Sequence, residues 1–146
     1  MVRRMAIALL SLIAGLSAVY LHLYKLGIVG HLTCSSGGCE RAIFSRWGWF
    51  LGVDVALVGV IGYTLLLVTS LASLQPRWQA ARWPVLALLG FAVLGFLFTL
   101  RLKFAEFVIL RTFCPWCAIS AVAITTITIL AVLEYQFTRR ACPAGV

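Results

Sequence analysis

The sequence predicts an all-α integral membrane protein whose four transmembrane helices pack as a bundle. The chain has 146 residues, of which 63% are hydrophobic and only 11% charged. A soluble domain of this size carries about 45–50% apolar and about 25% charged residues. Four apolar stretches reach the length of about 20 residues that crosses a bilayer. None alternates with the period of two of a membrane barrel strand, so their backbone groups must be satisfied within helices.

The four spans belong to a single predicted domain that covers residues 1–146. They are expected at about 5–24, 51–74, 83–100 and 113–133. The apolar run behind the two N-terminal arginines also fits a cleaved signal peptide. We favour a retained first span, because the run is long and no clean small-x-small site precedes Tyr20.

The longest connection, residues 25–50, joins the first two spans. Within it, Ile43, Phe44 and Trp47 share one helical face, and the polar residues lie elsewhere. This pattern predicts a short amphipathic helix lying on the membrane surface.

Four of the five cysteines form two close pairs. Cys34 and Cys39 lie between the first and second spans, and Cys114 and Cys117 lie between the third and fourth. Odd-numbered connections of a bundle fall on the side opposite the N-terminus, so both pairs face one compartment. The fifth cysteine, Cys142, belongs to the C-terminal tail on the other side and is interpreted as a bystander thiol.

The orientation is predicted from chemistry, because charge does not decide it. The 12 Lys and Arg residues divide evenly between the two predicted sides, so the positive-inside rule gives no answer. Disulfide exchange belongs to an oxidising compartment. We therefore expect a multi-pass protein of a bacterial inner membrane with its cysteine pairs facing the periplasm or cell exterior. The net charge of +8 does not indicate nucleic-acid binding, because the basic residues are scattered between apolar runs.

A Cys-x-x-Cys pair that opens a helix has two different sulfur positions. Three residues rise about 4.5 Å along a helix, so Cys114 is expected at the mouth of the bundle and Cys117 about one turn deeper. The positive end of the helix lowers the pKa of a thiol there and favours the thiolate, and Pro115 suits the first helical position. Cys114 can then exchange with another disulfide, while Cys117 meets a lipid-soluble oxidant.

The loop pair, Cys34 and Cys39, encloses two glycines. Such a loop can accept electrons from a soluble protein and pass them on through a mixed disulfide, which we place between Cys39 and Cys114. Two alternatives stay open: a non-enzymatic membrane scaffold with two structural disulfides, and a four-cysteine zinc site. We do not favour zinc, because an oxidising compartment oxidises its ligands.

These motifs resemble the vitamin K epoxide reductase family, in its bacterial-type single-domain form. The resemblance rests on CERAIFSRWGWFLGV, which begins at Cys39, and on FCPWCAIS, which begins at Phe113. The order of the cysteine pairs agrees as well, although the loop pair is spaced more tightly than is usual in the family.

The resemblance implies a four-helix bundle around a quinone and a bacterial-type enzyme that oxidises a thioredoxin-like partner. It implies that Cys117 contacts the quinone, that Cys114 exchanges with Cys39, and that Cys34 meets the partner. Many relatives carry the partner as a fused domain; here we expect a separate, DsbA-type protein. The quinone is a menaquinone, a ubiquinone or a vitamin K form, and no metal or flavin is needed. The direction of electron flow, including reduction of an epoxide, is left open.

Two further residues are candidates for the quinone site. Asp54, near the start of the second helix, either hydrogen-bonds a quinone oxygen or assists proton transfer, or it is an interfacial carboxylate that is hydrated or paired with Arg46. Trp116 either lines the quinone pocket or packs in the bundle. The charged residues at the outward end of the third helix are expected to be mostly solvated; they are Arg101, Lys103, Glu106 and Arg111.

Overall fold

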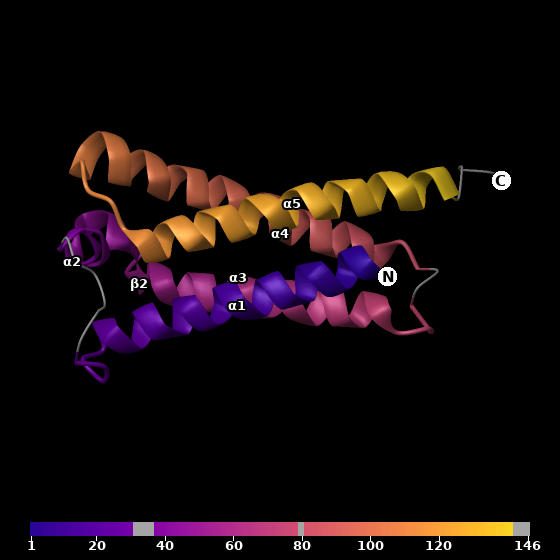
Figure 1. Cartoon of the computed structure of the whole chain (residues 1–146), viewed down its shortest axis with the longest axis horizontal. Coiled ribbons are helices and arrows are strands. Elements are labelled where there is room, and N and C mark those ends of the chain that lie inside the picture. Colours follow the sequence, from indigo (N-terminus) through magenta and orange to yellow (C-terminus); the bar gives the residue numbers. More distant parts are fainter. Residues whose placement is uncertain (31–36, 79–80, 142–146) are drawn as a thin grey trace.

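The computed structural model describes residues 1–30, 37–78 and 81–141. Its elements are α1 (Val2–Lys25), α2 (Gly38–Phe44), the 3-10 turn η1 (Arg46–Gly48), β1 (Trp49–Phe50), β2 (Val53–Asp54), α3 (Val55–Leu74), α4 (Trp83–Phe104), the π-helical η2 (Ala105–Leu110) and α5 (Pro115–Ala141). The four long helices run side by side, with α2 at one end (Figure 1). Helices α1 and α4 each contact both α3 and α5. The predicted bundle and the short helix after its first member are confirmed.

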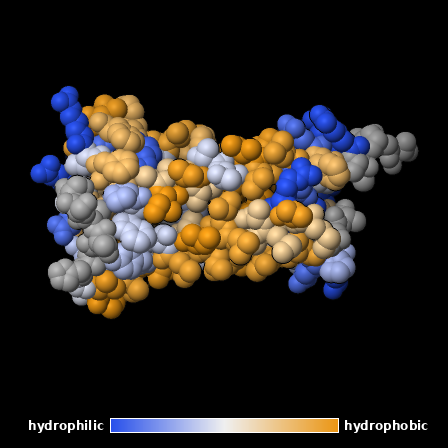
Figure 2. Space-filling view, in the orientation of Figure 1, coloured by the Kyte–Doolittle hydropathy of each residue, from blue (hydrophilic) through white to orange (hydrophobic). Residues whose placement is uncertain are grey.

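The surface of the bundle explains its place in a membrane. Apolar side chains cover the middle of the molecule, and hydrophilic ones gather at both ends (Figure 2). Within the described chain, four helices are long and apolar enough to cross a bilayer. Many of their leucines point outward, such as Leu9, Leu94 and Leu97, each more than half exposed. Such a surface suits lipid rather than water, so the chain is a multi-pass membrane protein.

The second span begins later than predicted, because residues 49–54 form a hairpin instead of helix. Trp49 pairs with Asp54 and Phe50 with Val53, across a two-residue turn of Leu51 (φ 52°) and Gly52 (φ 81°). A turn with positive φ at both central residues matches the twist of the two strands. Asp54 then ends the hairpin and caps α3, since its carboxylate accepts the Ala56 N–H at 3.1 Å. Helix α3 therefore starts at Val55 and not at residue 51.

The C-terminal ends of the third and fourth helices lie well beyond prediction, and α5 ends at Ala141 where residue 133 was expected. Helix α4 continues through η2 to Leu110, beyond the expected end at residue 100. Arg111 stops it with φ 47°, and Pro115 opens α5. The short helix divides its apolar residues: Ile43 is buried, whereas Phe44 is 57% exposed.

The end of the bundle remote from α2 is held by buried charge. Arg4 Nε lies 2.7 Å from a carboxylate oxygen of Glu134, and Arg4 Nη1 donates to the Ser73 carbonyl at 2.5 Å. Ser70 Oγ donates back to the carbonyl of Arg4 at 2.8 Å. Three helices, α1, α3 and α5, are thus joined at this end, and each polar group has a partner, as burial requires.

Candidate functional site

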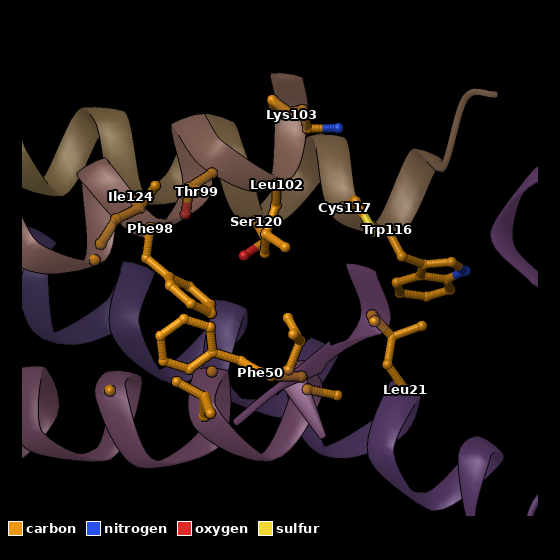
Figure 3. Close-up of a pocket in the computed structure, with 18 of the residues that line it drawn as sticks. Leu21, Phe50, Phe98, Thr99, Leu102, Lys103, Trp116, Cys117, Ser120 and Ile124 are labelled. Atoms are coloured by element: carbon orange, nitrogen blue, oxygen red, sulfur yellow. The ribbon is translucent and has the colours of Figure 1, made fainter. Parts of the chain in front are cut away.

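A cavity of about 440 Å³ opens near the α2 end of the bundle. It is walled by α1, α2, the hairpin and the three other long helices. Aromatic rings close one part of it, where Phe50 and Phe98 meet edge to face with centroids 5.3 Å apart (Figure 3). Cys117 and Trp116 lie at another part of the wall (Figure 3). The cavity is apolar with a few polar groups, as ligand pockets usually are.

The two cysteines of the Cys-x-x-Cys pair have different surroundings. Cys117 lines the cavity, whereas Cys114 is fully buried outside the cavity lining. Cys114 acts as the N-cap of α5: its sulfur accepts the Cys117 N–H at 3.4 Å, and its carbonyl accepts the Ala118 N–H at 3.0 Å. Both are free thiols. The structure therefore separates the two sulfurs, one towards the cavity and one away from it. Cys114 opens α5 as predicted, but it is fully buried instead of accessible at the mouth of the bundle, whereas Cys117 is only partly buried.

The pKa of the Cys114 thiol lies below its ordinary value. The main cause is a hydrogen bond with the Cys117 thiol; burial opposes it, and the Cys117 N–H adds to it. A cysteine at a helix N-terminus is expected to behave in this way. The thiolate form of Cys114 is therefore easier to reach than that of an ordinary cysteine.

Cys39 lies in the same buried cluster as Cys114. The cluster contains both cysteines with Leu21 and Ile43, and neither sulfur-bearing residue is exposed. Gly38 makes this packing possible, because a Cβ there would lie 2.5 Å from the Phe113 carbonyl oxygen. Cys39 is disulfide-bonded. Cys34 and Cys142 lie outside the described residues.

The structure ties up the carboxylate of Asp54. Asp54 lines the cavity, but Oδ2 lies 2.7 Å from His22 Nδ1 and Oδ1 accepts from Lys25 Nζ at 2.9 Å. Of the two roles weighed for Asp54, the structure favours ion pairing, yet with Lys25 rather than Arg46. Burial pushes the pKa of this carboxyl up, and the hydrogen bonds from His22, Lys25 and the Ala56 N–H outweigh it, so the pKa lies below its usual 3.8.

Replacing Asp54 with asparagine should destabilise the protein by about 2 kcal/mol at neutral pH, the size of hydrogen bonds to charged groups. The depressed pKa makes this contribution present above the unfolded value of about 3.9 and lost as the pH falls through the folded one. Thermal unfolding of both proteins in detergent measures it. The difference should shrink below about pH 4; a constant difference would contradict the assignment.

Trp116 lines the cavity and packs on Tyr20, with ring centroids 5.1 Å apart.

The cavity wall also holds a pair of hydroxyl groups that was not predicted. The Tyr63 hydroxyl lies 2.6 Å from Ser120 Oγ, and both residues line the cavity. Ser120 is three residues after Cys117, so it shares a helical face with it; that spacing was the available signal.

Glu106 is buried, although it was expected to be solvated. It is 4% exposed and lines the cavity together with Lys103. One carboxylate oxygen accepts the Cys114 N–H at 2.5 Å, and the other lies 2.6 Å from Lys103 Nζ. Arg101, in contrast, is exposed as expected, and its guanidinium lies 5.0 Å from the centroid of the Trp47 ring.

The described residues hold no group of three or more His, Cys, Asp or Glu that could bind one metal ion. Cys34, one of the ligands in the four-cysteine zinc alternative, lies outside these residues.

The fold and the site together define a polytopic membrane protein with a dithiol at the head of an apolar cavity. The sequence model of the Vitamin K epoxide reductase family matches residues 5–132. The chain belongs to this family. Its members are oxidoreductases that act on quinone or vitamin K substrates, and membership implies thiol-driven reduction of a quinone or an epoxide.

Proposed function

We propose that the protein is a thiol:quinone oxidoreductase that oxidises a separate thioredoxin-like protein and reduces a membrane quinone, thereby supporting disulfide bond formation. The observation that carries the proposal is the division of the Cys-x-x-Cys pair. Cys117 lies on the cavity wall, and Cys114 packs with Cys39. One dithiol can then deliver electrons to the cavity and receive them from the loop.

The cavity fits a quinone. Its volume of about 440 Å³ lies within the roughly 300–1,000 Å³ of ligand pockets, and aromatic side chains such as Phe50 and Phe98 can pack on a flat ring. Tyr63 and Ser120 supply hydroxyl groups on the same wall. These features suit the flat quinone ring that menaquinone, ubiquinone and vitamin K forms have in common. A bound quinone supplies a two-electron acceptor that takes up two protons as it becomes quinol.

The proposed electron route balances at each exchange. The reduced partner opens the Cys34–Cys39 disulfide and leaves with its own disulfide. The Cys39 thiolate attacks Cys114 of an oxidised Cys114–Cys117 pair and releases the Cys117 thiolate. Cys34 then attacks Cys39, which restores the loop disulfide and frees Cys114. The two thiols, Cys114 and Cys117, finally give two electrons and two protons to the quinone and close their disulfide.

The redox states in the structure match one step of this route. Cys39 is disulfide-bonded, while Cys114 and Cys117 are free. This is the state that precedes quinone reduction. Cys39 and the Cys114–Cys117 pair lie at connections on one side of the bundle. We assign this side to the periplasm or cell exterior of a bacterial inner membrane, since disulfides persist in oxidising compartments.

The test is turnover by the full chain in liposomes that contain menaquinone or ubiquinone, with a reduced DsbA-type protein as donor. One quinone should be reduced for each partner oxidised, as followed by quinone absorbance. The Cys39→Ser variant should lose partner-driven turnover. It should keep turnover with dithiothreitol, which can reduce the Cys114–Cys117 pair, here called the inner pair, directly.

Absence of quinone reduction with either donor would overturn the proposal. Turnover with dithiothreitol alone would favour the alternative function, a thiol-driven quinone or epoxide reductase that does not oxidise a DsbA-type protein. Offering vitamin K epoxide as the acceptor in the same assay separates the two, because only an epoxide reductase consumes it.

A further inference from the structure

Two charged side chains at the end of α4 take no part in the proposed electron route. Lys103 belongs to the last turn of α4, and Glu106 to η2. Both line the cavity, and their side chains are only 16% and 5% exposed. Buried charges are costly unless they are paired and hydrogen-bonded. The burial of two charges beside a redox dithiol therefore indicates that they have a role there.

The contact of Glu106 with Cys114 reproduces one half of a capping box. In that motif the N-cap side chain accepts the N–H of the third helical residue, and an acid at this third position reaches back to the N–H of the N-cap. Here Cys114 is the N-cap and its sulfur accepts the N–H of Cys117, the third residue. The returning acid is Glu106, eight residues earlier. An acid from the preceding helix thus leaves the third position to a cysteine.

This arrangement brings a negative charge to the exchange thiol. A carboxylate next to Cys114 disfavours the thiolate, since like charges repel. The Lys103 ammonium, 2.6 Å from the other oxygen of Glu106, offsets that charge. Among the described residues, the further ionisable group that acts on Cys114 is Cys117 from α5, and Cys39 from α2 packs there as a disulfide.

We propose that Glu106 and Lys103 form a positioning pair for Cys114. Glu106 fixes the backbone of the Cys-Pro-Trp-Cys turn through the Cys114 N–H, and Lys103 cancels the charge that this contact brings to the thiol. The inference rests on the proposed function, because it assigns Cys114 to the exchange of disulfides.

A titration of the Cys114 thiolate tests the pair without quinone or partner. The full chain carrying Cys34→Ser, Cys39→Ser and Cys117→Ser leaves Cys114 no disulfide to attack. It is titrated by thiolate ultraviolet absorbance, and the signal of the same chain with Cys114→Ser added is subtracted. Glu106→Gln keeps an acceptor for the Cys114 N–H but removes the charge, so the midpoint should move to lower pH. Lys103→Met should move it to higher pH, and the double variant should return close to the starting value.

Opposite shifts that cancel in the double variant support the pair, whereas any other pattern overturns it. A purely structural role would not reverse the sign between the two variants. The titration gives its result whether or not the protein turns over quinone, so failure of the proposed function is recognised separately.

A second measurement checks the geometric half of the inference. Glu106→Ala removes the acceptor and should lower quinone turnover by at least about tenfold, because small misplacements of reacting groups carry large rate costs. Glu106→Gln should recover most of that loss. Circular dichroism of both variants checks that the helices persist. Equal losses in Glu106→Ala and Glu106→Gln would overturn the backbone contact.

Discussion

Replacing Cys117 with serine is expected to abolish quinone reduction with any thiol donor. Cys117 is the cysteine of the inner pair that lines the cavity, and a serine hydroxyl cannot pass two electrons to a quinone. Cys114 stays buried with Cys39 and can still attack the loop disulfide. Without Cys117 to resolve it, a Cys39–Cys114 mixed disulfide should accumulate. Quinone absorbance measures the first effect, and mass spectrometry of unreduced peptides measures the second.

Two further variants sharpen this result. Cys114→Ser should also lose turnover with the partner, but without forming the mixed disulfide, because it lacks the exchanging sulfur. Cys142→Ser should leave turnover unchanged, since the tail cysteine has no place in the route. Turnover by the Cys117→Ser variant would contradict the mechanism, and a trapped link from a cysteine other than Cys39 would redraw the route through the loop.

Replacing Gly38 with alanine is expected to separate the two cysteine pairs. A Cβ at this position would lie 2.5 Å from the carbonyl oxygen of Phe113, closer than real Cβ contacts allow. The atoms that this Cβ would meet all belong to the backbone of Phe113 and cannot turn aside. Helix α2 must therefore move away from Phe113 and carry Cys39 away from Cys114. Partner-driven turnover should fall by at least about tenfold. Turnover with dithiothreitol, which needs only the inner pair, should change much less.

Gly30→Ala is the matched control for this substitution. Gly30 lies in the same connection, and a Cβ there would meet nothing within 4 Å, so both turnovers should persist. Equal losses with both donors in Gly38→Ala would mean that the substitution disturbs the inner pair itself. Full partner-driven activity would mean that electrons do not pass between Cys39 and Cys114.

The bundle was predictable because lipid imposes a simple constraint on composition and length. The hairpin was not predicted, because its residues are mostly apolar and continue directly into the second span, so they resemble the start of that helix. Leu51 adopts a positive φ, which is uncommon for a bulky residue, and Leu-Gly is a weaker hairpin signal than Asn-Gly. The boundary error at α3 followed directly from this segment.

The site was predictable only as far as short sequence spacing reaches. The spacing of Cys114 and Cys117 predicted different surroundings for their sulfurs, and the structure shows different surroundings. It did not predict that Cys114 would be fully buried, because that depends on the packing of α2 against this turn. The partners of Tyr63 and Glu106 depend on packing between segments. Tyr63 meets a residue 57 positions later, and the depth of Glu106 depends on how η2 turns into α5. A charge pattern alone made Glu106 resemble a solvated residue.

The ion pair between Arg4 and Glu134 has a consequence for biosynthesis. Its two members are 130 residues apart, so the ribosome makes nearly the whole chain before the arginine can meet its carboxylate. The first helix must wait in the membrane with that charge at its end until the last helix has been inserted. The ion pair that holds Arg4 therefore forms late in biosynthesis. A truncated chain that lacks α5 also lacks Glu134 and cannot form it.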